Sequence, residues 1–192
     1  MFRASLHRTA LCLAAVAVLP VWAGPAAAAP PTDVSVPEPT TFTSTLTSTA
    51  TPDQVVDDFG KPMPGQPGAS GTFTLRINSQ QDIVCYDITL TGVTQPYESS
   101  ARTATHLQEG KPGESGYPRM VFPDPQGPPG GPLTSKGCLK GPFTTGVVLA
   151  RGDTGRGFRL AMVESNPADW FVDVHTKQFR VGAVRGQLVK AG

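Results

Sequence analysis

Residues 170–188 read "WFVDVHTKQFRVGAVRGQL", two alternating segments separated by a short turn-bearing stretch. In the first segment three apolar side chains alternate with Asp173 and His175, so these two polar side chains leave the same face of a strand. The second segment, 183–189, returns with Arg185 on the face that meets Asp173 or His175 across a hairpin, where we expect an Asp173–Arg185 ion pair. The stretch therefore predicts an antiparallel hairpin with one apolar and one polar face.

The same two-residue alternation recurs upstream and predicts a fold made of strands. The candidates are 41–51 (a polar edge strand), 72–78, 83–93, 101–107 and 117–122, with 144–153 ambiguous between strand and turn. The 20 Pro and 21 Gly residues argue against long helices. We expect at most one short helix, at 160–165, because Asn166-Pro167 would stop it. About eight strands separated by turns predict an all-β Greek-key sandwich or barrel.

The first 29 residues carry the pattern of a secretory signal peptide. Arg3 and Arg8 form a basic start, residues 11–22 are almost entirely apolar, and 26–29 are alanines, so we expect cleavage after residue 28 or 29. Cys12 lies inside the apolar stretch, where a lipid-anchored cysteine would not stand. The sequence thus predicts a secreted protein, extracellular or associated with the cell envelope.

Beyond this segment we expect a flexible lead-in over 30–40 and one β domain over 41–190. No later stretch is apolar enough for a transmembrane segment. Loss of Arg3 and Arg8 reduces the 16 Lys+Arg to 14 against 15 Asp+Glu, so the mature chain has a net charge of −1. This balance argues against nucleic acid as a partner.

Two cysteines, Cys85 and Cys138, remain in the mature chain. An even pair in an exported protein is most simply a disulfide. A metal site with two thiolate ligands is the alternative, but no C-x-x-C spacing supports it.

Three motifs resemble the CHRD domain, the module named after chordin: "THLQEG" at 105–110, "FVDVHT" at 171–176 and "GAVRGQL" at 182–188. The resemblance covers 41 to about 189, and "VCYDITL" at 84–90 and "SKGCL" at 135–139 are similar to the cysteine-bearing segments of secreted bacterial members. We expect the sandwich to be immunoglobulin-like or superoxide-dismutase-like.

Two positions depart from the family pattern. Gln108 stands where the pattern has the second histidine of a pair, and Asp173 stands where it has asparagine. The resemblance implies that His106 and His175 approach each other, and with Asp173 or Glu109 they could hold copper or zinc. Because Gln108 removes a ligand, we expect His106, Gln108, Asp173, His175 and Arg185 to form a structural or ligand-contacting polar cluster without a cofactor.

No nucleophile motif such as G-x-S-x-G occurs, so we expect no catalysis. The tripeptide Arg151-Gly152-Asp153 leaves integrin-like adhesion open, although such a tripeptide is common by chance. The sequence therefore predicts a secreted, monomeric, non-catalytic binding or structural module for an unknown extracellular ligand such as a protein. The alternative is a copper- or zinc-binding, redox-related protein that uses His106 and His175.

Overall fold

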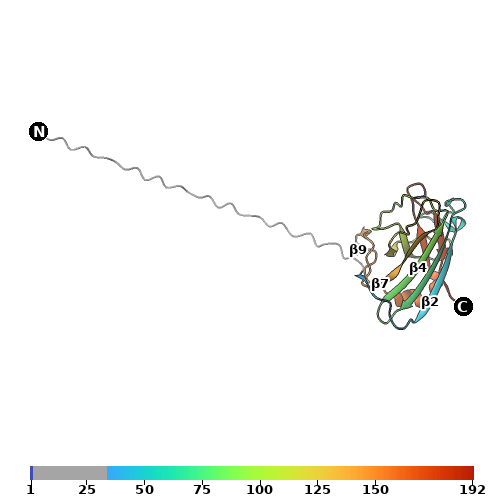
Figure 1. The fold of residues 1–192 in the computed structure, drawn as a ribbon, viewed down its shortest axis with the longest axis horizontal. Helices are drawn as coiled ribbons and strands as arrows, with labels where there is room; N and C mark the ends of the chain where they lie inside the picture. The colour runs from blue at the N-terminus through green and yellow to red at the C-terminus, as the bar shows by residue number, and fades with distance from the viewer. Residues whose placement is uncertain (2–33) are drawn as a thin grey trace.

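The computed structural model describes Met1 and residues 34–192 (Figure 1). The predicted signal peptide lies outside the described residues, apart from Met1. No described helix could cross a membrane, since the longest, α1 (Leu160–Ser165), has six residues. This helix occupies the residues predicted for it. Two short 3-10 helices, η1 (Pro52–Gln54) and η2 (Pro167–Asp169), complete the helical structure of the described chain.

The protein is an all-β sandwich of antiparallel sheets, as the sequence predicts. The six-stranded sheet has the order β1 (Val34–Ser35), β7 (Leu133–Lys140), β4 (Ile83–Thr91), β3 (Ser70–Asn78), β2 (Ser44–Ala50), β12 (Val189–Lys190). The four-stranded sheet has the order β11 (Val184–Gln187), β10 (Trp170–Val174), β5 (Thr105–Glu109), β6 (Pro118–Phe122). A small hairpin is formed by β8 (Val148–Leu149) and β9 (Gly152–Asp153).

Alternation along the strands fills the space between the two large sheets. The long strands of these sheets turn most of their apolar side chains inward, because burial removes apolar surface from water at roughly 25 cal/mol per Å². The six-stranded sheet contributes residues such as Phe73, Leu75 and Ile88, and the four-stranded sheet contributes Val172 and Val174. The apolar face predicted for the C-terminal hairpin therefore faces the core, and its polar face points away from it.

Chain crossovers and one backbone pairing connect the two large sheets. After β4 it crosses to the second sheet, forms β5 and β6, and returns as β7 beside β4, a connection of Greek-key type. At the other side, Thr51 at the end of β2 exchanges two backbone hydrogen bonds with Arg185 of β11, at 2.8 and 3.1 Å. A Cβ atom on Gly186 would lie 2.4 Å from Ser48 Oγ and 2.6 Å from the Thr49 carbonyl oxygen. Gly186 thus permits the close packing that its place inside a strand suggests.

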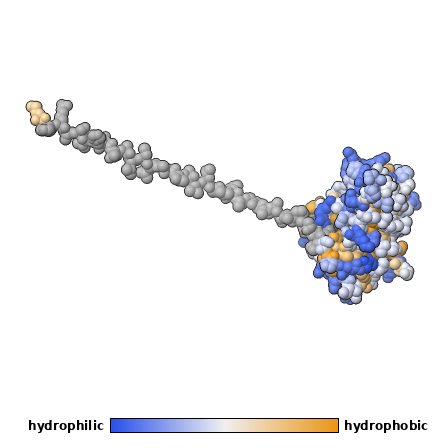
Figure 2. Space-filling view, viewed as in Figure 1, coloured by the Kyte–Doolittle hydropathy of each residue, from blue (hydrophilic) through white to orange (hydrophobic). Residues whose placement is uncertain are grey.

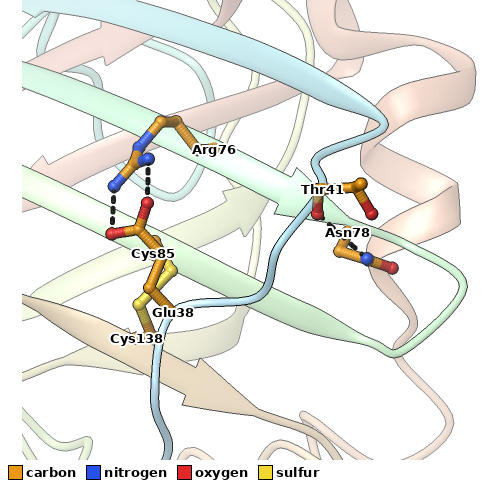
Figure 3. Close-up of a disulfide and its surroundings, with 6 residues drawn as sticks. All are labelled: Glu38, Thr41, Arg76, Asn78, Cys85 and Cys138. Carbon is orange, nitrogen blue, oxygen red and sulfur yellow. Dashed lines mark hydrogen bonds and ion pairs between the residues drawn. A yellow bond between two sulfur atoms is a disulfide. The ribbon is translucent and has the colours of Figure 1, made fainter.

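The predicted disulfide between Cys85 and Cys138 is present, and it joins directly opposed residues of β4 and β7. Figure 3 shows the segment before β2, which carries Glu38 and Thr41, passing beside this disulfide. There Arg76 donates to Glu38 at 2.8 Å. Residues Val34–Ser35 also pair with β7. Within the predicted lead-in, this backbone pairing and this ion pair thus join residues 34–38 to the sheet.

Two other predictions differ from the structure, one in where a strand begins and one in where a strand lies in its sheet. The strand expected at 101–107 begins at Thr105, because the Asp124 carboxylate accepts the Ala104 N–H at 2.8 Å in place of a strand partner. The expected edge strand, β2, lies second from the edge, next to the two-residue β12. The face of the domain seen in Figure 2 is largely hydrophilic, with hydrophobic patches between polar regions.

Candidate functional site

The polar face of the C-terminal hairpin lies on the outer side of the four-stranded sheet. Asp173 in β10 stands directly opposite His106 in β5 on one side and Arg185 in β11 on the other. Phe171, two residues earlier on the same face, stands opposite Gln108. The register therefore gathers four of the five predicted cluster residues around β10, and His175 follows at its end.

Asp173 is the centre of this cluster. The residue is only 4% exposed, and its carboxylate accepts hydrogen bonds from His106 Nδ1 at 3.1 Å, from His175 Nε2 at 2.8 Å and from the Gln108 side-chain amide. The two imidazole rings lie 5.1 Å apart, centroid to centroid, as the resemblance implies. Gln108 therefore supplies a donor to Asp173 at the place where the family pattern has a histidine.

The outer nitrogen of each imidazole faces a backbone carbonyl. His106 Nε2 lies 2.7 Å from the Thr103 oxygen, and His175 Nδ1 lies 2.7 Å from the Arg180 oxygen. Carbonyl and carboxylate oxygens only accept, so each ring satisfies both contacts when both of its nitrogens carry a proton. In the metal-free protein, this arrangement favours the imidazolium form of His175 beside the Asp173 carboxylate.

Electrostatics support this arrangement at His175. Burial opposes its charged form, but the Asp173 carboxylate and the Arg180 carbonyl outweigh that effect and raise the pKa of His175 to about 9. Burial likewise acts to raise the pKa of Asp173, and the two histidines more than offset it, so the pKa of this carboxyl is held far below its ordinary value.

Arg185 is directly opposite Asp173 but does not pair with it. Its guanidinium carbon lies 3.6 Å from the centroid of the Phe171 ring, and its NH2 donates to the Lys111 carbonyl at 3.1 Å. No carboxylate within the described chain forms an ion pair with Arg185, so the predicted Asp173–Arg185 pair is wrong. The reason is the stacking partner, because Phe171 holds the planar guanidinium flat against its ring while Asp173 is occupied by the histidines. Burial lowers the pKa of Arg185, whereas Asp173 and Glu114 act in the opposite direction.

A pocket of about 400 Å³ opens over this cluster, with four of the five cluster residues and Phe171 in its floor and Arg185 at its side. Its walls come from loops at 55–58, 99–100, 115–118 and 180–182, with Val147. Ser115 Oγ donates to the Asp58 carbonyl at 3.1 Å and thereby ties two of these loops together. Tyr117 and Val181 are exposed at the pocket. The volume falls within the range of small-molecule sites.

Ser99 is a pocket residue that sequence reasoning missed. Its Oγ lies 3.2 Å from His106 Nε2, and His106 in turn contacts Asp173, which resembles the order of a Ser–His–Asp triad. The Thr103 carbonyl, however, lies closer to the same nitrogen, at 2.7 Å. A base must offer a lone pair to serine, whereas this carbonyl requires Nε2 to carry a proton. The geometry therefore opposes activation of Ser99.

The residues fit a metal ion in part. His106, Asp173 and His175 each offer one possible ligand atom, and these three atoms lie within 4.8 Å of one another. The outer N–H of each ring would be held by a backbone carbonyl, which is how metal-bound histidines are usually oriented. Glu109, the other predicted ligand, is not part of this group, because its side chain is more than half exposed and lies 3.7 Å from Arg119. A metal would thus have three protein ligands and a neighbouring arginine.

The Arg151-Gly152-Asp153 tripeptide does not present its carboxylate as an adhesion signal would. Asp153 accepts backbone hydrogen bonds from Thr145, Gly146 and Gly155 at 2.8 to 3.0 Å. These bonds lower the pKa of Asp153 although burial acts to raise it. The carboxylate is therefore committed to its own loop.

Fold and site together define a disulfide-linked β-sandwich with a polar pocket on the outer face of one sheet. The family model for the CHRD domain matches residues 46–188, and the chain belongs to this family. Searches of curated proteins and of solved structures found no match.

Proposed function

We propose that this CHRD domain is a non-catalytic binding module and that its ligand occupies the pocket over Asp173. The observation that carries the proposal is the convergence of buried polar side chains on a pocket of about 400 Å³. A buried network of this kind is costly unless its hydrogen bonds are satisfied, and here it lines a pocket instead of being covered by the core. Such convergence is typical of ligand sites rather than of a sheet face that is only solvated.

The bonding of His106 supports the absence of catalysis. The Thr103 carbonyl accepts a hydrogen bond from His106 Nε2, so this nitrogen carries a proton and offers Ser99 no lone pair as a base. Assays of the protein and of Ser99→Ala on a panel of esters, glycosides and peptides test this point. Turnover by the wild type that Ser99→Ala abolishes would refute the non-catalytic assignment.

A small-molecule library tested by thermal shift examines the binding function itself. We expect a subset of compounds to raise the melting temperature of the wild type, because a ligand that binds only the folded state stabilises it. Tyr117→Ala, at the pocket, should weaken these shifts. Val189→Ala, which changes an exposed apolar residue of β12 that does not line the pocket, is the matched control and should leave them unchanged.

Export is part of the proposal. The basic start, apolar stretch and alanine run before residue 30 support it, and so does the disulfide, since such bonds persist mainly in oxidising compartments. Localisation of the full-length protein in its natural host, compared with a variant lacking residues 2–29, tests it. Retention of the full-length chain inside the cell would contradict export.

A metal site is the second candidate function, favoured by the grouping of His106, Asp173 and His175 with carbonyl-held outer nitrogens. Titration calorimetry with zinc and with copper on the wild type and on His175→Gln tests it. Stoichiometric binding that His175→Gln abolishes would support the metal site. Absence of binding and of any metal in protein purified without a chelating tag would exclude it.

A further inference from the structure

We propose that the ligand of this pocket carries an oxyanion, such as a carboxylate, sulfate or phosphate group, and that Arg185 binds it. This inference rests on the proposed binding function and names the chemical class of its ligand. It starts from a cation that is almost completely buried and forms no ion pair with any described residue.

The first step is the environment of Arg185. Only 5% of the residue is exposed, yet it lines the pocket. A guanidinium has five N–H donors, and the described chain supplies one hydrogen-bond acceptor, the Lys111 carbonyl. Among the described residues, the fully buried side-chain atoms without a partner belong to Ser48, Thr103 and Arg119. The remaining donors of Arg185 are therefore open to the pocket and not sealed in the interior.

The second step is charge. Buried charges in proteins are normally paired. Arg180, the other arginine at the pocket, is paired with Glu98, whereas Arg185 has no ion pair within the described chain. Asp173, the nearest carboxylate by register, is surrounded by the donors of the histidines and Gln108. Within the described chain, Arg185 is thus a cation of the pocket without a directly paired carboxylate.

The third step is orientation. Stacking on Phe171 and the bond to Lys111 fix the plane of the guanidinium before any ligand arrives. A fixed fork of N–H groups matches a planar carboxylate or a phosphate with two parallel hydrogen bonds. Besides Asp173, the acidic residues that line the pocket are Asp57 and Asp58, and Asp57 Oδ1 accepts the N–H groups of Phe59 and Lys61. The anion is therefore expected beside β11, where Arg185 lies.

The test compares matched probes on the wild-type protein at neutral pH with EDTA present. Benzoate is compared with benzamide, and phenylacetate with phenylacetamide, by isothermal titration and by the side-chain Nε–Hε resonance of Arg185. A charge-assisted contact in a buried site predicts at least about tenfold tighter binding of each acid than of its amide. Inorganic phosphate and sulfate should compete with the acids.

Variants localise the effect. Arg185→Gln should remove the preference for the acid, and Arg185→Lys, which keeps the charge without the fork, should reduce it. Arg76→Gln, at a surface arginine paired with Glu38 on the other sheet, is the control and should retain it. If Arg185→Gln does not fold, the acid–amide comparison and the Arg185 resonance in the wild type still show whether Arg185 binds the anion.

Equal binding of acid and amide in the pocket would overturn this inference and leave the proposed function standing. Binding of acids only after addition of zinc or copper would place the anion on a metal and would also overturn it. If no probe and no library compound binds at the pocket, the proposed function falls together with the inference.

Discussion

Raising the pH should destabilise the metal-free protein through a single group, His175. Its folded-state pKa is about 9, above the ordinary 6.5, because Asp173 and the Arg180 carbonyl favour the protonated ring despite burial. A group whose pKa is raised on folding contributes stability that is fully present below its unfolded pKa and is lost as the pH rises through its folded pKa. The free energy of unfolding should therefore decline between pH 6.5 and pH 9.

The magnitude follows from the size of the shift. A change from 6.5 to about 9, at 1.36 kcal/mol per pH unit, amounts to about 3 kcal/mol. The lowered pKa of Asp173 describes largely the same interaction from the side of the carboxylate, so the two contributions are not added. About 3 kcal/mol is a large fraction of the stability of a typical domain.

Urea denaturation at several pH values from 6 to 9.5, with EDTA present, measures this decline. His175→Gln provides the control, because a neutral amide can still donate to Asp173 but does not titrate. The variant should be less stable than the wild type at pH 6.5 and should show a nearly flat profile up to pH 9. A wild-type profile as flat as that of the variant would refute the electrostatic account of the cluster.

Three further predictions concern the scaffold. Gly186→Ala should lower the free energy of unfolding by about 1–3 kcal/mol through overpacking, and Ser48→Ala should restore little of it because backbone atoms of β2 also clash; full rescue would contradict this. Replacing Cys85 and Cys138 together by alanine should cost about 4 kcal/mol for a loop that spans 53 residues, measured by urea denaturation, and an unchanged midpoint would argue against it. N-terminal sequencing of the exported protein should begin at residue 29 or 30, and an intact start at residue 1 would refute cleavage.

Much of the fold follows from alternation in the sequence. The apolar faces of β3, β4 and β10 are evident from side-chain parity, and Asn166-Pro167 correctly ends the helix. Strand β7 was not predicted, because its residues 134–137 are small or polar and lack an apolar face. Composition likewise does not reveal that residues 34–35 of the lead-in pair with β7.

The candidate site was predicted less completely than the fold. Parity places Asp173 and His175 on one face, and the family motifs bring His106 to them. The strand register does not determine which neighbour a long side chain contacts, so the sequence does not reveal the stacking of Arg185 on Phe171. An aromatic residue on the polar face, two positions before Asp173, was the available signal. The carbonyl contacts of the histidines come from loops, which carry no periodic pattern.

The most direct test of the binding function is an amide chemical-shift map of the ¹⁵N-labelled protein with the compounds that stabilise it. The account predicts that perturbed amides cluster in the pocket walls at 55–58, 115–118 and 180–182 and in β10 beside Asp173. Perturbations confined to the outer face of the six-stranded sheet, with the pocket amides unchanged, would contradict it.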